Sequence, residues 1–230
     1  MKIQGLQKMT LLDYPGRVAC TVFLGGCDFR CPFCHNFDLV VGPMPVAVSE
    51  DEFFAFLDKR HGLLDGVAIT GGEPCLRPDL PEFIMRIREA GFLVKLDTNG
   101  YHPAMLRRLI EEGLVDYVAM DIKNSPQKYA RTIGLQEINL ERISESIALL
   151  MDSHIPYEFR TTVVRELHES CDFEEIGKWI EGADKYFLQA FTARDTVPDP
   201  TLSAPDPASL LEFRDIAARY AKLAEVRGVE

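Results

Sequence analysis

The sequence predicts an α/β protein with a parallel sheet, and three observations support this prediction. Short apolar segments alternate with amphipathic helical segments six times along the 230 residues. Strands that are separated by helices are typical of parallel sheets with right-handed crossovers. The apolar segments end in glycine or polar residues, at the strand ends where α/β proteins place their sites. Six units are two fewer than in a closed eight-fold barrel, so an open, partial barrel and a doubly wound sheet both fit.

The expected strands are apolar runs bounded by turn-forming residues. They cover residues 17–24, 66–70, 92–96, 115–120, 156–164 and 185–191. Ser49, followed by three acidic residues, is typical of the start of a helix. The expected helices cover residues 50–60, 79–90, 103–112, 139–152, 173–181 and 207–226.

Length and composition indicate one globular domain over residues 1–230, with 47% hydrophobic and 27% charged residues. Residues 1–16 are expected to form a turn-rich lead-in, 17–192 the core, and 193–230 a proline-rich stretch and a last helix. The net charge of −11 argues against a nucleic-acid partner.

No apolar run approaches 18 residues and no signal peptide opens the chain, so we expect a cytoplasmic protein without a membrane partner.

In a reducing compartment the six cysteines are not expected to form disulfides. Three of them, Cys20, Cys75 and Cys171, are scattered and are expected to be buried small hydrophobes. The histidines near helix ends, including His168, are expected to face solvent.

The other three cysteines, Cys27, Cys31 and Cys34, form a C-x₃-C-x₂-C motif directly after the first expected strand. A closed zinc site and a complete iron–sulfur cluster both take four protein ligands. Three thiolates on one loop therefore suggest a four-iron cluster with one iron left open for a ligand. The alternative is a zinc site that adds His35, although its position next to Cys34 makes a shared tetrahedron awkward.

Polar motifs follow the later strands. Gly71-Gly72-Glu73-Pro74 offers glycines where a ligand can approach the backbone and a carboxylate that suits an ammonium, although alone it reads as a turn. Asp97-Thr98-Asn99-Gly100 and Asp121-Ile122-Lys123 follow the next two strands. Arg160 lies within an apolar strand, so its charge must be paired or must reach a polar cavity.

The cysteine motif, with Phe33 as the aromatic residue before the third cysteine, resembles the signature of the radical S-adenosylmethionine (SAM) enzymes. The resemblance implies a partial (β/α)₆ barrel and a [4Fe–4S] cluster held by the three cysteines. It also implies that the amino and carboxylate groups of SAM chelate the open iron. An electron from the cluster then cleaves SAM to a 5′-deoxyadenosyl radical.

The same resemblance assigns roles to residues at the strand ends. Gly71 and Gly72 resemble the motif that holds the methionyl ammonium of SAM, with Glu73 either contacting SAM or ordering the turn. The pair of motifs that follows resembles the glycyl-radical-enzyme activases. There the matching residues face SAM and the incoming partner, and a monovalent cation lies near Asp97 and Asp121. The cofactor-binding residues implied in this way are Asp97, Thr98, Asn99, Asp121, Lys123, Arg160, Gln189 and Phe191.

Within that group the chain is most similar to the longer anaerobic ribonucleoside-triphosphate reductase activating proteins. Asp13-Tyr14-Pro15-Gly16 and Gly71-Gly72-Glu73-Pro74-Cys75-Leu76 carry this similarity. Only 36 residues separate Cys34 from Gly71, which leaves no room for a ferredoxin-like insert. The implied reaction removes hydrogen from a glycine Cα of a glycyl radical enzyme, with a flavodoxin- or ferredoxin-type electron donor.

Two alternatives remain open at this point. One is a radical SAM enzyme that acts on a small molecule, similar to the 7-carboxy-7-deazaguanine synthases. The other is a non-catalytic iron–sulfur module, which would neither bind SAM nor form deoxyadenosine.

Overall fold

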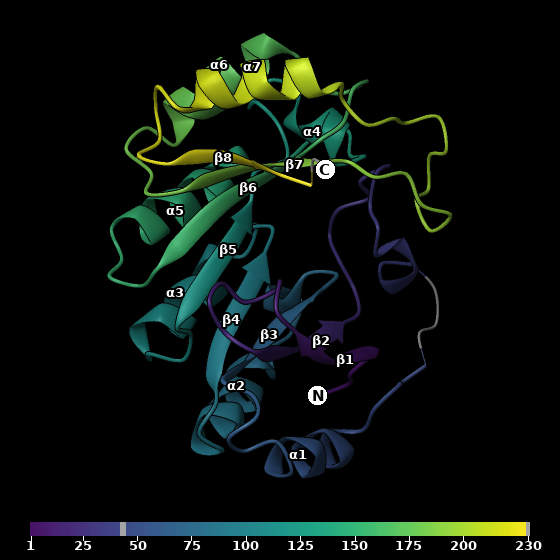
Figure 1. Cartoon of the computed structure of the whole chain (residues 1–230), viewed down its shortest axis with the longest axis vertical. Coiled ribbons are helices and arrows are strands. Elements are labelled where there is room, and N and C mark those ends of the chain that lie inside the picture. Colours follow the sequence, from purple (N-terminus) through teal and green to yellow (C-terminus); the bar gives the residue numbers. More distant parts are fainter. Residues whose placement is uncertain (42–44, 229–230) are drawn as a thin grey trace.

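A computed structural model describes residues 1–41 and 45–228 of the chain. Its centre is one curved sheet of eight strands, which follow one another in sequence order (Figure 1). The strands are β1 (Gly5–Thr10), β2 (Ala19–Leu24), β3 (Gly66–Gly71), β4 (Leu93–Thr98), β5 (Tyr117–Asp121), β6 (Tyr157–Val163), β7 (Tyr186–Ala190) and β8 (Ala224–Arg227). The pairing of β1 with β2 is antiparallel, and every later pair is parallel.

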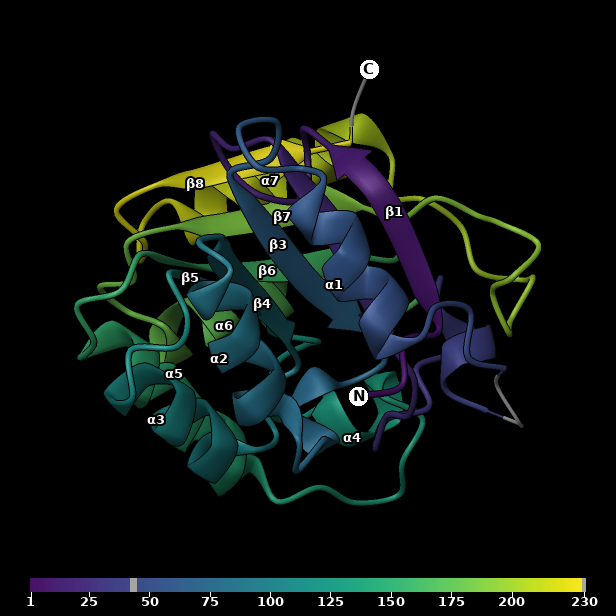
Figure 2. The same ribbon diagram turned by 90° about the horizontal axis from the view of Figure 1, so that it is seen from below.

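The helices cover the outer, convex side of this sheet, as Figures 1 and 2 show. The longer ones are α1 (Glu50–Asp58), α2 (Leu80–Glu89), α3 (Pro103–Glu111), α5 (Leu140–Met151), α6 (Ser170–Trp179) and α7 (Pro207–Ala217). Three short elements complete the described chain, namely η1 (Phe37–Leu39), η2 (Pro74–Leu76) and α4 (Tyr129–Thr132). Ser49 caps α1, as its sequence predicts, and it also forms a capping box with Glu52.

The six predicted strands are confirmed as β2 to β7, and the sheet is an open, partial barrel. Within the described residues the edge strands β1 and β8 pair with β2 and β7 and not with each other. The prediction was wrong at both ends of the chain. The expected lead-in contains β1, whose central residues are exposed, and the expected last helix ends at Ala217 and gives way to β8.

The two faces of the strands differ in chemistry. Side chains that face the helices are apolar and fully buried, as with Ile69 on β3 and Leu96 on β4. The alternating side chains of β4 and β6, Lys95, Asp97, Glu158 and Arg160, are polar. A partial barrel therefore gives this chain an apolar shell and a charged interior.

Two burial predictions were wrong. Cys171 is exposed, because it lies in the first turn of α6 on the outside of the molecule, whereas Cys20 and Cys75 are buried as expected. His168 is 4% exposed, and its ring lies between β5, β6 and α6, where Nε2 donates to the Lys123 carbonyl oxygen over 3.0 Å and Nδ1 accepts from the Val164 amide over 3.1 Å. No helix in the described ranges has the length and apolar content needed to cross a membrane.

Candidate active site

A cavity lies at the carboxyl ends of the central strands, where the cysteine loop meets the turns after β3, β4 and β5. The predicted site residues from Cys27 through Arg160 all line it, with the exception of Glu73. The lining consists of Cys27, Phe29, Cys31, Phe33, Cys34, His35, Asn36, Val40, Thr70, Gly71, Gly72, Asp97, Thr98, Asn99, Asp121, Lys123, Arg160 and Thr162. Motifs that are up to 133 residues apart in the chain, from Cys27 to Arg160, therefore share one small volume.

The three thiols of the cysteine loop are buried or half-buried. Burial raises the pKa of the Cys27 thiol to about 11 and that of Cys31 to about 12, and the positive charge of Lys123 opposes both shifts. Buried thiolates thus need a cationic metal beside them. The Phe29 amide and the Asn99 side chain donate to the Cys27 sulfur over 3.4 and 3.8 Å.

The spacing of these sulfurs fits a cluster better than a single zinc ion. Among the described residues, the three sulfur atoms do not all lie within 4.8 Å of one another. Three thiolates on one tetrahedral zinc, with Zn–S bonds of about 2.3 Å, would lie only about 3.8 Å apart. The sulfurs also face a common cavity, as ligands of three different irons of one cluster would.

His35 does not join the cysteines as a fourth ligand. Its Nε2 atom bonds the carbonyl oxygen of Thr192 over 2.6 Å, and its ring stacks on Phe191 at 5.4 Å between centroids. The residue after it, Asn36, donates to the carbonyl oxygen of Gly71 over 3.0 Å. The loop is thereby fixed at its end to β3 and to the segment that follows β7.

Gly71 and Gly72 are required by the close packing of their turn on the start of the cysteine loop. A Cβ atom on Gly71 would lie 2.3 Å from the carbonyl oxygen of Leu24, and one on Gly72 would lie 2.0 Å from that of Gly26. These two oxygens accept hydrogen bonds from Gly72 and Glu73 over 2.8 and 2.7 Å. The glycines therefore hold the cysteine loop against β3, while their own atoms line the cavity.

Glu73 orders two turns at once. It is 1% exposed, and its carboxylate accepts hydrogen bonds from the Cys75 amide, the Thr98 hydroxyl and the Asn99 amide over 2.9, 2.8 and 2.6 Å. Burial raises its pKa, although these three donors oppose the shift. Glu73 was expected either to contact SAM or to order the turn, and the described contacts show that it orders the turns.

A charged network forms the floor of the cavity. Arg160 donates to Asp121 over 2.9 Å and lies 3.4 Å from Asp97, and the register of β5 and β6 places Asp121 directly opposite Arg160. Lys123 bonds Asp121 over 2.9 Å, and Lys95 bonds Asp97. Burial alone would raise the pKa of both aspartates, but the neighbouring cations hold both pKa values below the usual range. The pairing predicted for the strand arginine is thus confirmed, and Arg160 also reaches the cavity.

Lys95 has no counterpart among the predicted site residues. Its side chain is 2% exposed. Its ammonium pairs with the carboxylate of Asp97, which lies two positions later on β4. With Lys123 and Arg160 it places three basic groups on two carboxylates, which leaves one formal positive charge in excess. Both carboxylates of the expected cation site are therefore already paired with basic side chains.

The two predicted residues of the last core strand lie beside the cavity and do not line it. Phe191 is 1% exposed and supports the His35 ring. Gln189 lines a neighbouring hollow, which shares His35 and Thr162 with the main cavity.

Sequence reasoning missed several lining residues. Phe29 and Asn36 belong to the cysteine loop, so their proximity to the motif was the available signal, and His35 was considered only as a zinc ligand. Thr162 lies two residues after Arg160 and shares its face of the strand, which the alternation of β6 could have indicated. Val40 and Thr70 carry no comparable signal in the sequence.

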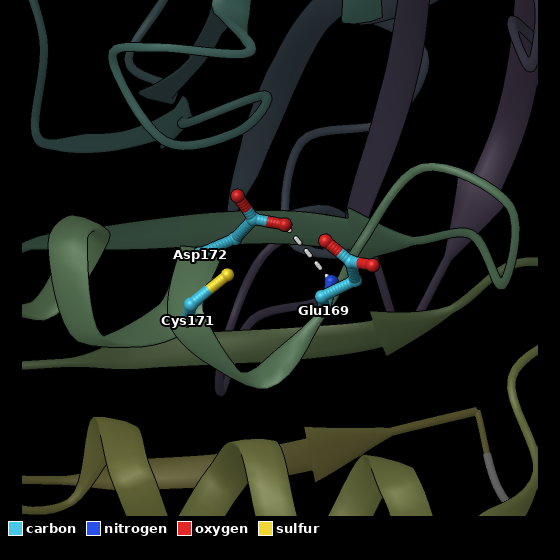
Figure 3. A group of neighbouring side chains, drawn as sticks. All are labelled: Glu169, Cys171 and Asp172. Atoms are coloured by element: carbon cyan, nitrogen blue, oxygen red, sulfur yellow. Dashed lines mark hydrogen bonds between the residues drawn. The ribbon is translucent and has the colours of Figure 1, made fainter.

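A second group of potential ligands, Glu169, Cys171 and Asp172, lies at the start of α6 (Figure 3). Asp172 is already bonded to the Glu169 amide over 2.9 Å, to Ser125 and to Lys128. Glu169 and Asp172 form a capping box. These contacts show that the carboxylates of this group cap the start of α6.

Known proteins share both the sequence pattern and the fold of this chain. The family model of the radical SAM superfamily matches residues 21–180, and this chain therefore belongs to that superfamily. Membership implies a [4Fe–4S] cluster and SAM, and the cavity with its three thiols fits such a cluster.

Among the relatives, a candidate glycyl-radical enzyme activating enzyme of Methanocaldococcus jannaschii is 33% identical over 224 residues, covering 95% of this chain and 92% of the relative. This identity and coverage place the chain in the same family. The pyruvate formate-lyase-activating enzyme of Clostridium pasteurianum is 30% identical over 131 residues, covering 54% of this chain and 52% of the relative.

Solved structures share the fold at low identity. SuiB of Streptococcus suis bound to S-adenosylmethionine superposes with a TM-score of 0.68 at 13% identity, over 91% of this chain and 52% of that chain. QueE of Escherichia coli superposes with a TM-score of 0.55 at 19% identity, over 97% of this chain and 92% of that chain. Both likenesses concern the fold alone.

Proposed function

We propose that this protein activates a glycyl radical enzyme by removing a hydrogen atom from a glycine Cα of that partner. The observation that carries the proposal is the convergence, in one cavity, of the three-thiol loop and the charged residues at the ends of β4 and β5. A relative of matching length that carries the name of such an activating enzyme supports it.

Cys27, Cys31 and Cys34 would hold the [4Fe–4S] cluster, which supplies the electron that splits SAM. SAM would lie in the cavity between this loop and the charged floor. The backbone at Gly71 and Gly72 would receive its methionyl ammonium, and Arg160 its carboxylate or ribose. Lys123 faces the cavity and keeps a positive charge there, because its bond to Asp121 opposes the effect of burial and raises its pKa.

The remaining predicted residues would frame the cofactor. Asp97, Thr98 and Asn99 form the wall next to the cysteine loop, and Asn99 also touches the Cys27 sulfur. Phe33 packs within the loop at 5% exposure and would shield the cluster from water. Gln189, in the neighbouring hollow, would contact the adenine side, with Phe191 supporting the His35 ring between the two hollows.

For the cation we propose a replacement. The ammonium of Lys95 lies on the Asp97 carboxylate, where it supplies the positive charge that a bound monovalent cation would otherwise supply. The enzyme would then bind SAM without potassium or sodium.

The partner we propose is an anaerobic ribonucleoside-triphosphate reductase, with a flavodoxin- or ferredoxin-type protein as the electron donor. The proposal rests on the similarity of the Asp13-Tyr14-Pro15-Gly16 and Gly71-Gly72-Glu73-Pro74 segments to the activating proteins of that reductase. A protein substrate also suits a partial barrel, whose open side can admit a loop.

The test is to incubate the reconstituted protein with SAM, a reductant and a candidate partner, and to record the electron paramagnetic resonance spectrum. We expect a glycyl doublet on anaerobic ribonucleotide reductase, and none with a Cys31→Ala variant, which lacks one cluster ligand. A doublet only on another glycyl radical enzyme, such as pyruvate formate-lyase, would correct the partner. Deoxyadenosine formation without a doublet on any such enzyme would contradict the proposed function.

A further inference from the structure

Asn99, in the turn after β4, contacts a sulfur atom of the cysteine loop directly. Its side-chain nitrogen lies 3.8 Å from the Cys27 sulfur and donates to it. Sulfur has a larger radius than oxygen, so this distance is compatible with an N–H···S hydrogen bond. The residue is 6% exposed and lines the same cavity as the three cysteines. The contact therefore belongs to the wall that a cluster bound by these cysteines would face.

The orientation of the Asn99 side chain is fixed by a second contact. Its Oδ1 atom accepts a hydrogen bond from the Tyr101 amide over 2.9 Å. A backbone amide N–H can only donate, so the side-chain oxygen must face Tyr101 and the NH₂ group must face the sulfur. The buried Glu73 carboxylate also holds the backbone amide of Asn99 over 2.6 Å. The turn itself therefore keeps this donor against the Cys27 sulfur.

The three cysteines differ in the donors that surround their sulfur atoms. Cys27 has two N–H donors, the Phe29 amide over 3.4 Å and the Asn99 side chain. Cys34 has a backbone donor, which comes from Asn36. Among the described residues, Asn99 is the only one whose side chain donates to any of the three sulfurs. A side-chain donor can be replaced without changing the backbone, so the effect of this bond can be measured by itself.

Hydrogen bonds to the sulfur ligands are one of the factors that set the reduction potential of an iron–sulfur cluster. A donor stabilises the state with more negative charge on sulfur, which is the reduced state. We propose that the Asn99 side chain donates a hydrogen bond to the Cys27 thiolate of the bound cluster, and that it is a positioning residue that raises the reduction potential of this cluster. The inference rests on the proposed function only in requiring a bound [4Fe–4S] cluster.

The first test measures the midpoint potential of the cluster-loaded protein without SAM, by titration with dithionite followed by electron paramagnetic resonance. Asn99→Ala removes the donor. Asn99→Asp keeps an oxygen for the Tyr101 amide but puts a carboxylate in place of the donor. We expect a more negative potential in both variants, and the larger shift in Asn99→Asp, because its added negative charge also opposes reduction.

Asn36→Ala is the matched control. Asn36 also lines the cavity, but its side chain donates to the carbonyl oxygen of Gly71 and not to a sulfur. Its replacement should leave the potential unchanged. Similar shifts in Asn36→Ala and Asn99→Ala would overturn the proposal, because they would show that any loosening of the cavity wall lowers the potential.

The second test reads the bond in the wild type and so does not depend on a variant that loads its cluster. Protein labelled with ¹⁵N in its asparagine side chains is reduced and examined by pulsed electron paramagnetic resonance. We expect a ¹⁵N coupling to the cluster that persists in Asn36→Ala and is lost in Asn99→Ala and Asn99→Asp. No such coupling in the wild type would overturn the proposal.

SAM binding separates this role from a direct contact with SAM. Weaker SAM binding by Asn99→Ala at an unchanged potential would overturn the proposal and assign the side chain to SAM. A glycyl radical on the partner, with an unchanged potential in both Asn99 variants, would overturn this inference while the proposed function stands. A wild-type protein that binds no [4Fe–4S] cluster would overturn both.

Discussion

Gly72 shows how one missing side chain holds the site together. A Cβ atom there would lie 2.0 Å from the backbone oxygen of Gly26, which cannot move without displacing the cysteine loop. We expect Gly72→Ala to lower the free energy of unfolding by about 4 kcal/mol or more. Urea unfolding of the metal-free protein measures this loss.

Gly113→Ala is the matched control, because Gly113 has a positive φ of 62° and no atom within 4 Å of the position that an added Cβ would take. Its free energy of unfolding should fall by only about 1–2 kcal/mol, the cost of placing an alanine in the left-handed region. Equal losses in the two variants would mean that the contact with Gly26 is not what requires glycine at position 72.

Replacing Lys95 should make SAM binding depend on potassium. SAM binding to the cluster-loaded wild type, measured by calorimetry, should be the same in potassium chloride and in tetramethylammonium chloride. Lys95→Met leaves Asp97 without its nearest cation, so binding should weaken about tenfold in tetramethylammonium, equivalent to about 1.4 kcal/mol, and should recover in potassium.

Lys178→Met, at an exposed lysine of α6, should behave as the wild type in both salts. Potassium-dependent SAM binding by the wild type would show that Lys95 does not replace a metal cation.

His168 predicts a dependence of stability on pH. Burial lowers its pKa below the ordinary 6.5, although its bonds to the Lys123 and Val164 backbones and the nearby Asp172 oppose the shift, while Lys128 adds to it. The unfolded chain therefore binds a proton before the native protein does as the pH falls below about 6.5. The contribution is complete above that pH and is lost progressively below it.

His168→Gln should flatten this part of the curve of unfolding free energy against pH between 7 and 5. His154→Gln, at an exposed histidine, should keep the wild-type slope. A slope that persists unchanged in His168→Gln would assign the dependence to other groups.

At the scale of elements, β8 contributes more than an extra edge. Arg227 bonds both carboxylate oxygens of Glu158 over 2.8 and 3.0 Å, and Glu158 is 1% exposed in the barrel interior. The Arg227 side chain is itself 37% exposed, but its removal leaves the buried Glu158 charge with the Tyr117 hydroxyl, which bonds Glu158 over 2.9 Å. We expect Arg227→Met to lose about 2 kcal/mol in urea unfolding, less than for a fully buried pair because water already solvates part of the guanidinium.

Arg214→Met is the control, since the Arg214–Asp215 pair is exposed and should contribute less than about 1 kcal/mol. Similar losses in the two variants would show that β8 does not stabilise the interior through Glu158.

The elements themselves were predictable to different degrees. The six inner strands were found because apolar runs between helical segments leave a clear pattern. The strand β8 was missed because Ala-Glu-Val-Arg is too polar and short to stand out after a helix. The strand β1 was missed because its middle, Gln-Lys-Met, is exposed and lacks apolar alternation.

The residues of the candidate site were likewise predictable only where the sequence carries a clear pattern. Motif residues such as Asp97 and Lys123 were predictable because they end strands, and the structure brings them to one cavity. Lys95 was not predictable as a site residue, because the partner of a single lysine inside an apolar strand cannot be identified before the strand register is known.

At the scale of the whole molecule, the partial barrel separates two tasks. The apolar outer face of the strands and its helices stabilise the fold, while the interior face is left to charges that the cofactor site uses. Within the described residues β1 and β8 do not pair with each other, so the barrel is not closed along that side. The proposed function uses this open side to admit a loop of a partner protein, and its central claim is that the hydrogen donor is a glycine of that partner.

Deuterium transfer tests that claim most directly. A candidate partner prepared with glycine deuterated at Cα would be mixed with the cluster-loaded protein, SAM and a reductant, and the deoxyadenosine would be analysed by mass spectrometry. We predict deoxyadenosine that is heavier by one deuterium, together with a glycyl radical on the partner. Deoxyadenosine that stays unlabelled while the partner gains its radical, or that forms equally well without any partner, would contradict the account.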